Sequence, residues 1–180
     1  MKIVKIILIV IVVIVAIPLV GALFIKGDYA VERETTVKKS KAVVFDYVKH
    51  IKNQNNYSVW NMKDPHSKME YKGEDGTVGF VSSWDSDSAD VGKGEQEITK
   101  IADGSRVDME LRFKKPFEQT DYAYMTTDMV DSTQTKVVWG FNGTMKYPFN
   151  FMCLFMDMDK MLGPDLQKGL DNMKAIVEKQ

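Results

Sequence analysis

The stretch that decides the fold is GPDLQKGLDNMKAIVEK, residues 163–179, near the carboxyl terminus. Its apolar residues recur at helical spacing, so a helix here has one apolar face and one polar face. The apolar residues are Leu166, Leu170, Met173 and Val177. We expect Gly163-Pro164 to interrupt the chain and start this helix, because proline fits a first helical turn. A lone helix of this kind is marginal in water, so it needs an apolar surface to pack against.

The segments before this helix supply such a surface. From residue 67 onward, short runs rich in β-branched and aromatic residues alternate with turn residues, which is typical of an antiparallel sheet. Between residues 106 and 113 apolar and charged residues alternate strictly, which predicts one buried face and one solvated face. The seven predicted strands span residues 29–37, 68–72, 78–84, 94–101, 106–113, 119–129 and 135–144.

Helical segments are predicted between the first two strands. Ser40 is a suitable cap for a short amphipathic helix that continues to Ile51. The polar residues Asn53–Asn56 favour a turn that ends it, and residues 57–64 form a second short helix or a loop. The predicted order is therefore strand, two helices, six strands and a long final helix.

The amino-terminal region predicts a membrane helix. Residues 6–25 carry no charge, and at about 1.5 Å per residue they span a hydrocarbon core of roughly 30 Å. The run is longer than the core of a signal peptide and no clean A-x-A site follows it, which favours a retained signal anchor over a cleaved signal peptide. Lys2 and Lys5 place the short tail in the cytoplasm and the domain outside it, although basic residues also follow the span. We divide the chain into a membrane helix, 1–28, and a domain, 29–180.

Composition limits the classes of function. The chain has 180 residues, enough for one domain with an appendage, and its net charge of -1 lacks the basic footprint of a nucleic-acid-binding protein. Cys153 is the only cysteine, which excludes an intramolecular disulfide and a multi-cysteine metal site. We expect it to be a small buried apolar residue.

Tyr147–Met161 is unusually rich in phenylalanine and methionine. One interpretation is an additional core helix, because its apolar residues cover more than one face. The other is a lid over a cavity or a contact with the nearby bilayer surface, since both residue types are bulky and adaptable.

Several segments together resemble the START/SRPBCC superfamily, in its polyketide-cyclase-like branch and in a membrane-anchored bacterial form. The matching pieces are Trp60 followed by Asp64-Pro65, and residues 78–84, 113–117, 135–139 and 170–175. The resemblance implies the helix-grip fold, α+β, in which a curved seven-stranded sheet grips the last helix around an apolar cavity. It also implies a bacterial inner-membrane protein whose cavity binds a hydrophobic small molecule or lipid. The family includes carriers, cyclases and sensors, so the fold alone does not decide the function.

Large or adaptable side chains on the predicted buried faces are the candidates for lining such a cavity. They are Trp84, Met109, Leu111, Tyr124, Trp139, Phe141 and Met173. The alternative is that these residues pack against one another as an ordinary core.

Few residues suit catalysis, and we expect no cofactor and no metal. Glu95 and Glu97 share a strand face, and on an inner wall they would be the first acid/base candidates, together with Tyr124. His50 and His66 lack metal-ligand spacing, and the acidic loop 85–90 does not match a calcium-binding loop.

Three functions remain open from the sequence. The first is a membrane-tethered module that binds a hydrophobic small molecule or lipid without catalysis. The second is a cyclase or dehydrase acting on a hydrophobic or aromatic substrate, which the resemblance suggests. The third is a protein-interaction or stress-response domain whose cavity is filled by its own side chains.

Overall fold

The computed structural model describes residues 2–88 and 90–180. Its centre is one antiparallel sheet with the strand order β1-β7-β6-β5-β4-β3-β2. The strands are β1 (Asp28–Val37), β2 (Lys68–Lys72), β3 (Val81–Asp85), β4 (Lys93–Ala102), β5 (Arg106–Lys115), β6 (Gln119–Asp131) and β7 (Gln134–Thr144). All seven predicted strands are confirmed. β3 begins three residues late because Gly79, at φ 87°, turns the backbone out of the extended conformation.

Short helices cross from β1 to β2 and cover part of the inner face of the sheet. They are α2 (Lys41–Lys49), the 3₁₀ segment η1 (Ile51–Asn53), α3 (Gln54–Tyr57) and α4 (Val59–Lys63). The predicted turn at Asn53–Asn56 is wrong, since most of it lies in α3. Gln54 and Tyr57 are buried there, so tertiary packing outweighs the local preference of asparagine for turns.

The final helix, α5 (Met158–Val177), starts earlier than predicted. Asp157 caps it, and its carboxylate accepts a hydrogen bond from the backbone N–H of Lys160 at 3.2 Å. Pro164 lies inside the helix, where it removes one backbone hydrogen bond without ending the helix. Gly163 leaves room for the guanidinium of Arg33, which a β-carbon there would displace and which pairs with Asp159 at 2.7 Å.

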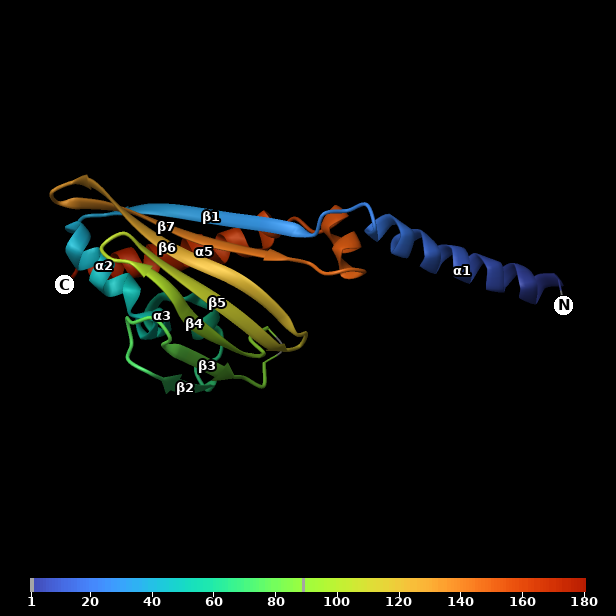
Figure 1. Ribbon diagram of the computed structural model, residues 1–180, viewed down its shortest axis with the longest axis horizontal. Helices are drawn as coiled ribbons and strands as arrows, with labels where there is room; N and C mark the ends of the chain where they lie inside the picture. Colours follow the sequence, from blue (N-terminus) through green and yellow to red (C-terminus); the bar gives the residue numbers. More distant parts are fainter. Residues whose placement is uncertain (1, 89) are drawn as a thin grey trace.

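The apolar stripe of α5 is confirmed, since all four of its predicted residues are at most 1% exposed. The helix packs mainly along β1, with a smaller contact to β7. Figure 1 shows α5 running along the sheet beside these strands. Because α5 covers the β1 side of the sheet, α2 to α4 and the space beneath them face the remaining strands.

Tyr147–Met161 is not a core helix. Residues Phe149–Leu154 form a 3₁₀ segment, η2, and Met158–Met161 belong to α5. Phe149, Leu154 and Phe155 are 59%, 60% and 77% exposed. These apolar side chains are exposed, and η2 packs beside α1.

The amino-terminal helix, α1 (Lys2–Ala22), projects from the end of the domain where β1 begins (Figure 1). In the described chain it is the one helix long and apolar enough to cross a membrane, with a mean hydropathy of 3.4. Its apolar side chains are exposed around its circumference, and only Ala22 is buried.

Candidate functional site

A cavity of about 560 Å³ lies between the inner face of the sheet and the short helices. Its roof comes from α3, α4 and the loop that follows, and its floor comes from β2 to β7. The last helix contributes only Leu166 among the described lining residues, so the cavity is not centred on α5 as the resemblance implied. The lining residues are Ile51, Gln54, Asn55, Ser58, Trp60, Asn61, Met62, Asp64, Pro65, Ser67, Met69, Ser82, Trp84, Asp90, Val91, Gln96, Leu111, Phe113, Ala123, Trp139, Phe141 and Leu166.

Aromatic side chains form much of the wall. All three tryptophans of the chain, Trp60, Trp84 and Trp139, line the cavity. The Trp139 ring meets Trp60 edge-on at 6.1 Å between ring centroids and Tyr57 at 5.7 Å. Trp84 meets Phe113 in the same way at 5.8 Å. Such edge-to-face contacts hold the rings in place, so the wall has a defined shape.

Nine of the 22 described lining residues are polar, and they lie deep as well as at the mouth. Gln54 on α3 and Gln96 on β4 are 6% and 9% exposed, and both amides reach the thioether of Met109. At the rim, the carboxylate of Asp64 accepts hydrogen bonds from Ser86 Oγ and from the backbone N–H of His66. These bonds, the one from Ser86 first, lower the pKa of Asp64, so its carboxylate is ionised at neutral pH.

Four of the seven predicted lining residues border the cavity: Trp84, Leu111, Trp139 and Phe141. Met109 and Met173 are 1% and 0% exposed and pack in the core beside it. Tyr124 lies on the outer face of the sheet, where the guanidinium of Arg106 covers its ring at 3.9 Å. Tyr124 points outward because its neighbours Ala123 and Met125 face the core.

The sequence did not single out the buried polar residues Gln54, Ser58, Ser82 and Gln96. One signal was available for Gln96. It alternates with Glu95 and Glu97 and shares its strand face with Gly94 and Ile98, so it sits at an apolar-face position. Nothing local distinguishes Gln54 and Ser58 from the other polar residues around them.

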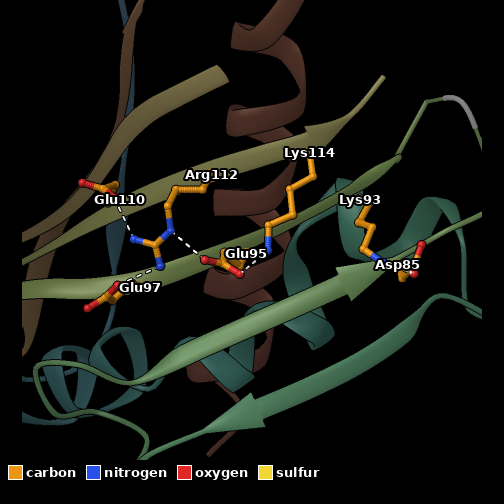
Figure 2. Close-up of polar contacts among 7 residues, drawn as sticks. All are labelled: Asp85, Lys93, Glu95, Glu97, Glu110, Arg112 and Lys114. Carbon is orange, nitrogen blue, oxygen red and sulfur yellow. Dashed lines mark hydrogen bonds and ion pairs between the residues drawn. The ribbon is translucent and has the colours of Figure 1, made fainter. Parts of the chain in front are cut away.

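Glu95 and Glu97 do not lie on an inner wall, which was the condition for their being acid/base candidates. Both face outward and pair with Arg112 at 2.7 and 2.8 Å, and Arg112 also pairs with Glu110 at 2.7 Å. Figure 2 shows this cluster on the side of β4 and β5 away from α5. The hydrogen bonds from Lys114 and Arg112 lower the pKa of Glu95.

β4 also contains a β-bulge beyond these two residues. The register of β4 against β5 shifts between Ile98 and Lys100, so Ile101 faces inward opposite Val107. The strand face that carries Glu95 and Glu97 therefore does not continue to Ile101, because one extra residue reverses the alternation. Over the residues that the structure describes, no group of three acidic, histidine or cysteine side chains is arranged to hold a metal ion.

A second polar cluster is buried on the inner face near the start of β1. Tyr29 donates a hydrogen bond to Asp121 at 3.1 Å, and the amide of Gln119 donates to both oxygens of the same carboxylate at 2.7 and 2.9 Å. Burial raises the pKa of Asp121, because it disfavours the charged form. Burial, followed by the nearby charge of Asp121, raises the pKa of Tyr29.

The junction between α1 and the domain is held by side-chain contacts. Asn150 on η2, 6% exposed, donates hydrogen bonds to the carbonyl oxygens of Ala22 and Ile25, each at 2.7 Å. Ala22 is the last residue of α1, where helical carbonyls lack partners within the helix, and Ile25 lies three residues beyond it. A β-carbon on Gly21 would lie 3.2 Å from the Phe151 ring, so α1 and η2 pack closely.

The sequence matches no protein-family model and no curated protein significantly. Solved structures are similar in fold. Norcoclaurine synthase from Thalictrum flavum, in complex with dopamine and hydroxybenzaldehyde, is 10% identical, with a TM-score of 0.61 over 88% of this chain and 91% of that one. Major latex-like protein 151 from Panax ginseng is 15% identical, with a TM-score of 0.57 over 83% of this chain and 97% of that one. With its seven-stranded curved sheet and long final helix, the chain shares the helix-grip fold of these structures.

Proposed function

We propose that this protein holds a hydrophobic small molecule or lipid in the cavity beneath α3 and α4, next to a membrane in which α1 anchors it. The single observation that carries the proposal is the cavity of about 560 Å³ with aromatic and aliphatic walls. Ligand sites of small molecules have this size and this mainly apolar lining with a few polar groups. Norcoclaurine synthase, which has a similar fold and is in complex with dopamine and hydroxybenzaldehyde, supports the proposal of a ligand site.

The membrane part of the proposal rests on α1 and on its junction with η2. A helix of 21 residues with no buried side chain except Ala22 needs an apolar environment, and a bilayer provides one. The contacts of Asn150 with α1 favour a retained anchor over a cleaved signal peptide, because cleavage would remove the carbonyl groups that Asn150 binds. The exposed side chains of η2 lie beside α1 and would enter the interfacial region of the same bilayer.

The enzymatic alternative gains no support from the site. Glu95, Glu97 and Tyr124 lie on the face opposite to the cavity. Among the described lining residues the ionisable groups are Asp64 and Asp90, and Asp64 is held in its ionised form. Proton transfer would need a group whose pKa lies near the working pH.

The test uses the full chain in lipid nanodiscs and the neutral probe N-phenyl-1-naphthylamine. Because every tryptophan of the chain lines the cavity, energy transfer from tryptophan to a bound probe reports binding at this site. Empty nanodiscs give the background from probe dissolved in lipid. We expect the energy transfer from tryptophan to the probe to saturate as the probe concentration rises.

Two neighbouring substitutions on β6 separate the cavity from the rest of the surface. Ala123→Leu adds a larger side chain to the cavity wall, and it should weaken probe binding by about tenfold or more. Tyr122→Leu changes the preceding residue, which is 48% exposed on the outer face, and it should leave probe binding unchanged. Equal affinities for both variants and the parent chain would remove the proposed site.

A further inference from the structure

The deep end of the cavity carries two amide side chains with unused hydrogen-bonding capacity. Gln54 and Gln96 approach from opposite walls and are 6% and 9% exposed. Within the described residues, the side-chain hydrogen bond of each goes to Met109 Sδ, at 3.7 and 2.8 Å. A thioether is a weak acceptor, whereas each primary amide offers two N–H donors and one carbonyl acceptor.

Buried side-chain polar atoms normally have at least one hydrogen-bond partner. The described polar atoms that are both fully enclosed and unpaired are Tyr47 Oη, Ser67 Oγ, Asp75 Oδ1 and Asn150 Oδ1. The amide groups of Gln54 and Gln96 are not in this set, although neither carbonyl oxygen accepts a hydrogen bond from the described residues. Since both residues line the cavity, their unused hydrogen-bonding groups face its interior.

The charges around the cavity restrict what can bind these amides. Of the described lining residues, none is lysine, arginine or histidine, and the two charged ones, Asp64 and Asp90, are acidic. Two lysines near lining residues in the sequence, Lys63 and Lys93, are paired with Asp165 and Asp85. An anion buried at the amides would therefore have no positive partner, and burying an unpaired charge is costly.

We propose that the cavity selects an apolar ligand that carries a neutral hydrogen-bonding group, such as a hydroxyl, carbonyl or amide, and that it discriminates against anionic ligands such as carboxylates. Gln54 and Gln96 bind the neutral group and thereby set the orientation of the ligand. This inference rests on the proposed function, because it concerns the occupant of the same cavity.

The experiment compares three competitors that share one ring system. Naphthalene has no polar group, 2-naphthol adds a neutral hydroxyl, and 2-naphthoate adds a carboxylate. Each displaces N-phenyl-1-naphthylamine from the full chain in nanodiscs. We expect 2-naphthol to bind about tenfold more tightly than naphthalene, the worth of one buried hydrogen bond. We expect 2-naphthoate to bind more weakly than both.

Gln96→Leu removes the polar group while keeping a side chain of similar length. This variant should lose the preference for 2-naphthol over naphthalene, and saturable binding of naphthalene shows that it is folded. Gln167→Leu is the matched control, because Gln167 bonds Asp171 on the surface of α5 and does not line the cavity. It should retain the preference of the parent chain.

The outcomes separate the two proposals. If none of the probes binds, the proposed function itself fails. If naphthalene binds but 2-naphthoate binds as tightly as 2-naphthol, or if Gln96→Leu leaves the preference unchanged, the cavity is a ligand site and the assigned ligand class is overturned.

Discussion

Replacing Trp139 by alanine should destabilise the domain more than any other single change in the cavity wall. Trp139 is 4% exposed and touches elements from three parts of the chain. Its ring packs edge-on against Tyr57 and Trp60, and a β-carbon at Gly169 of α5 would lie only 2.7 Å from it. The side chain therefore joins β7, the short helices and α5.

The expected cost follows from this burial. Truncating a buried tryptophan to alanine costs about 3–5 kcal/mol, a range that includes the lost ring contacts. One side of the Trp139 ring already borders the cavity, so we expect the lower end, about 3 kcal/mol. That is a large share of the roughly 5–15 kcal/mol by which domains are stable.

The assay is urea unfolding of the full chain in detergent micelles, followed by near-UV circular dichroism, because α1 would dominate a far-UV signal. Trp84→Ala is the control. Trp84 also lines the cavity but is only partly buried, and it has one aromatic partner, Phe113. A cost for Trp139→Ala below about 1 kcal/mol, or no larger than that of Trp84→Ala, would refute the view that this ring holds the three elements together.

Three further changes test other parts of the molecule. The raised pKa of Asp121 means that the folded state binds its proton more tightly than the unfolded state, so its contribution to stability is lost as the pH rises through that pKa. Asp121→Asn should therefore gain thermal stability relative to the parent chain at pH 7 and lose that advantage at pH 4, and a pH-independent difference would contradict this. Arg112→Leu should cost about 1 kcal/mol, because it leaves clustered carboxylates without their shared partner, and added salt should reduce the cost in urea unfolding. It should leave probe binding unchanged, and weaker binding would place the cluster in the site. The third change places a spin label at Phe155→Cys in a Cys153→Ser chain in nanodiscs. Its accessibility to oxygen and nickel should show that it lies about 5–10 Å deep in the bilayer interface. A label at Thr133→Cys should be in water. Equal nickel accessibility at both sites would exclude contact of η2 with the bilayer, and intact mass would show separately whether α1 is retained.

Local patterns in the sequence determined much of the fold. The spacing of Leu166, Leu170, Met173 and Val177 predicts the buried face of α5, because side chains at this spacing share one side of a helix. The alternation in residues 106–113 and the turn residues between the runs predict the strands of the sheet for the same kind of reason. The uncharged run in residues 6–25 predicts a helix that no soluble core covers.

Tertiary structure alone decided where the cavity lies and what faces it. Alternation shows that Glu95 and Glu97 share a face, but only the pairing of β4 with β5 places that face outside, against Arg112. Likewise, no local signal shows that α5 packs along β1, where Gly163 gives room to Arg33, and that the cavity is thereby left to α3 and α4. The physical reason is that local periodicity depends on neighbours along the chain, whereas the inside of a cavity is formed by residues that only strand register and helix packing bring together.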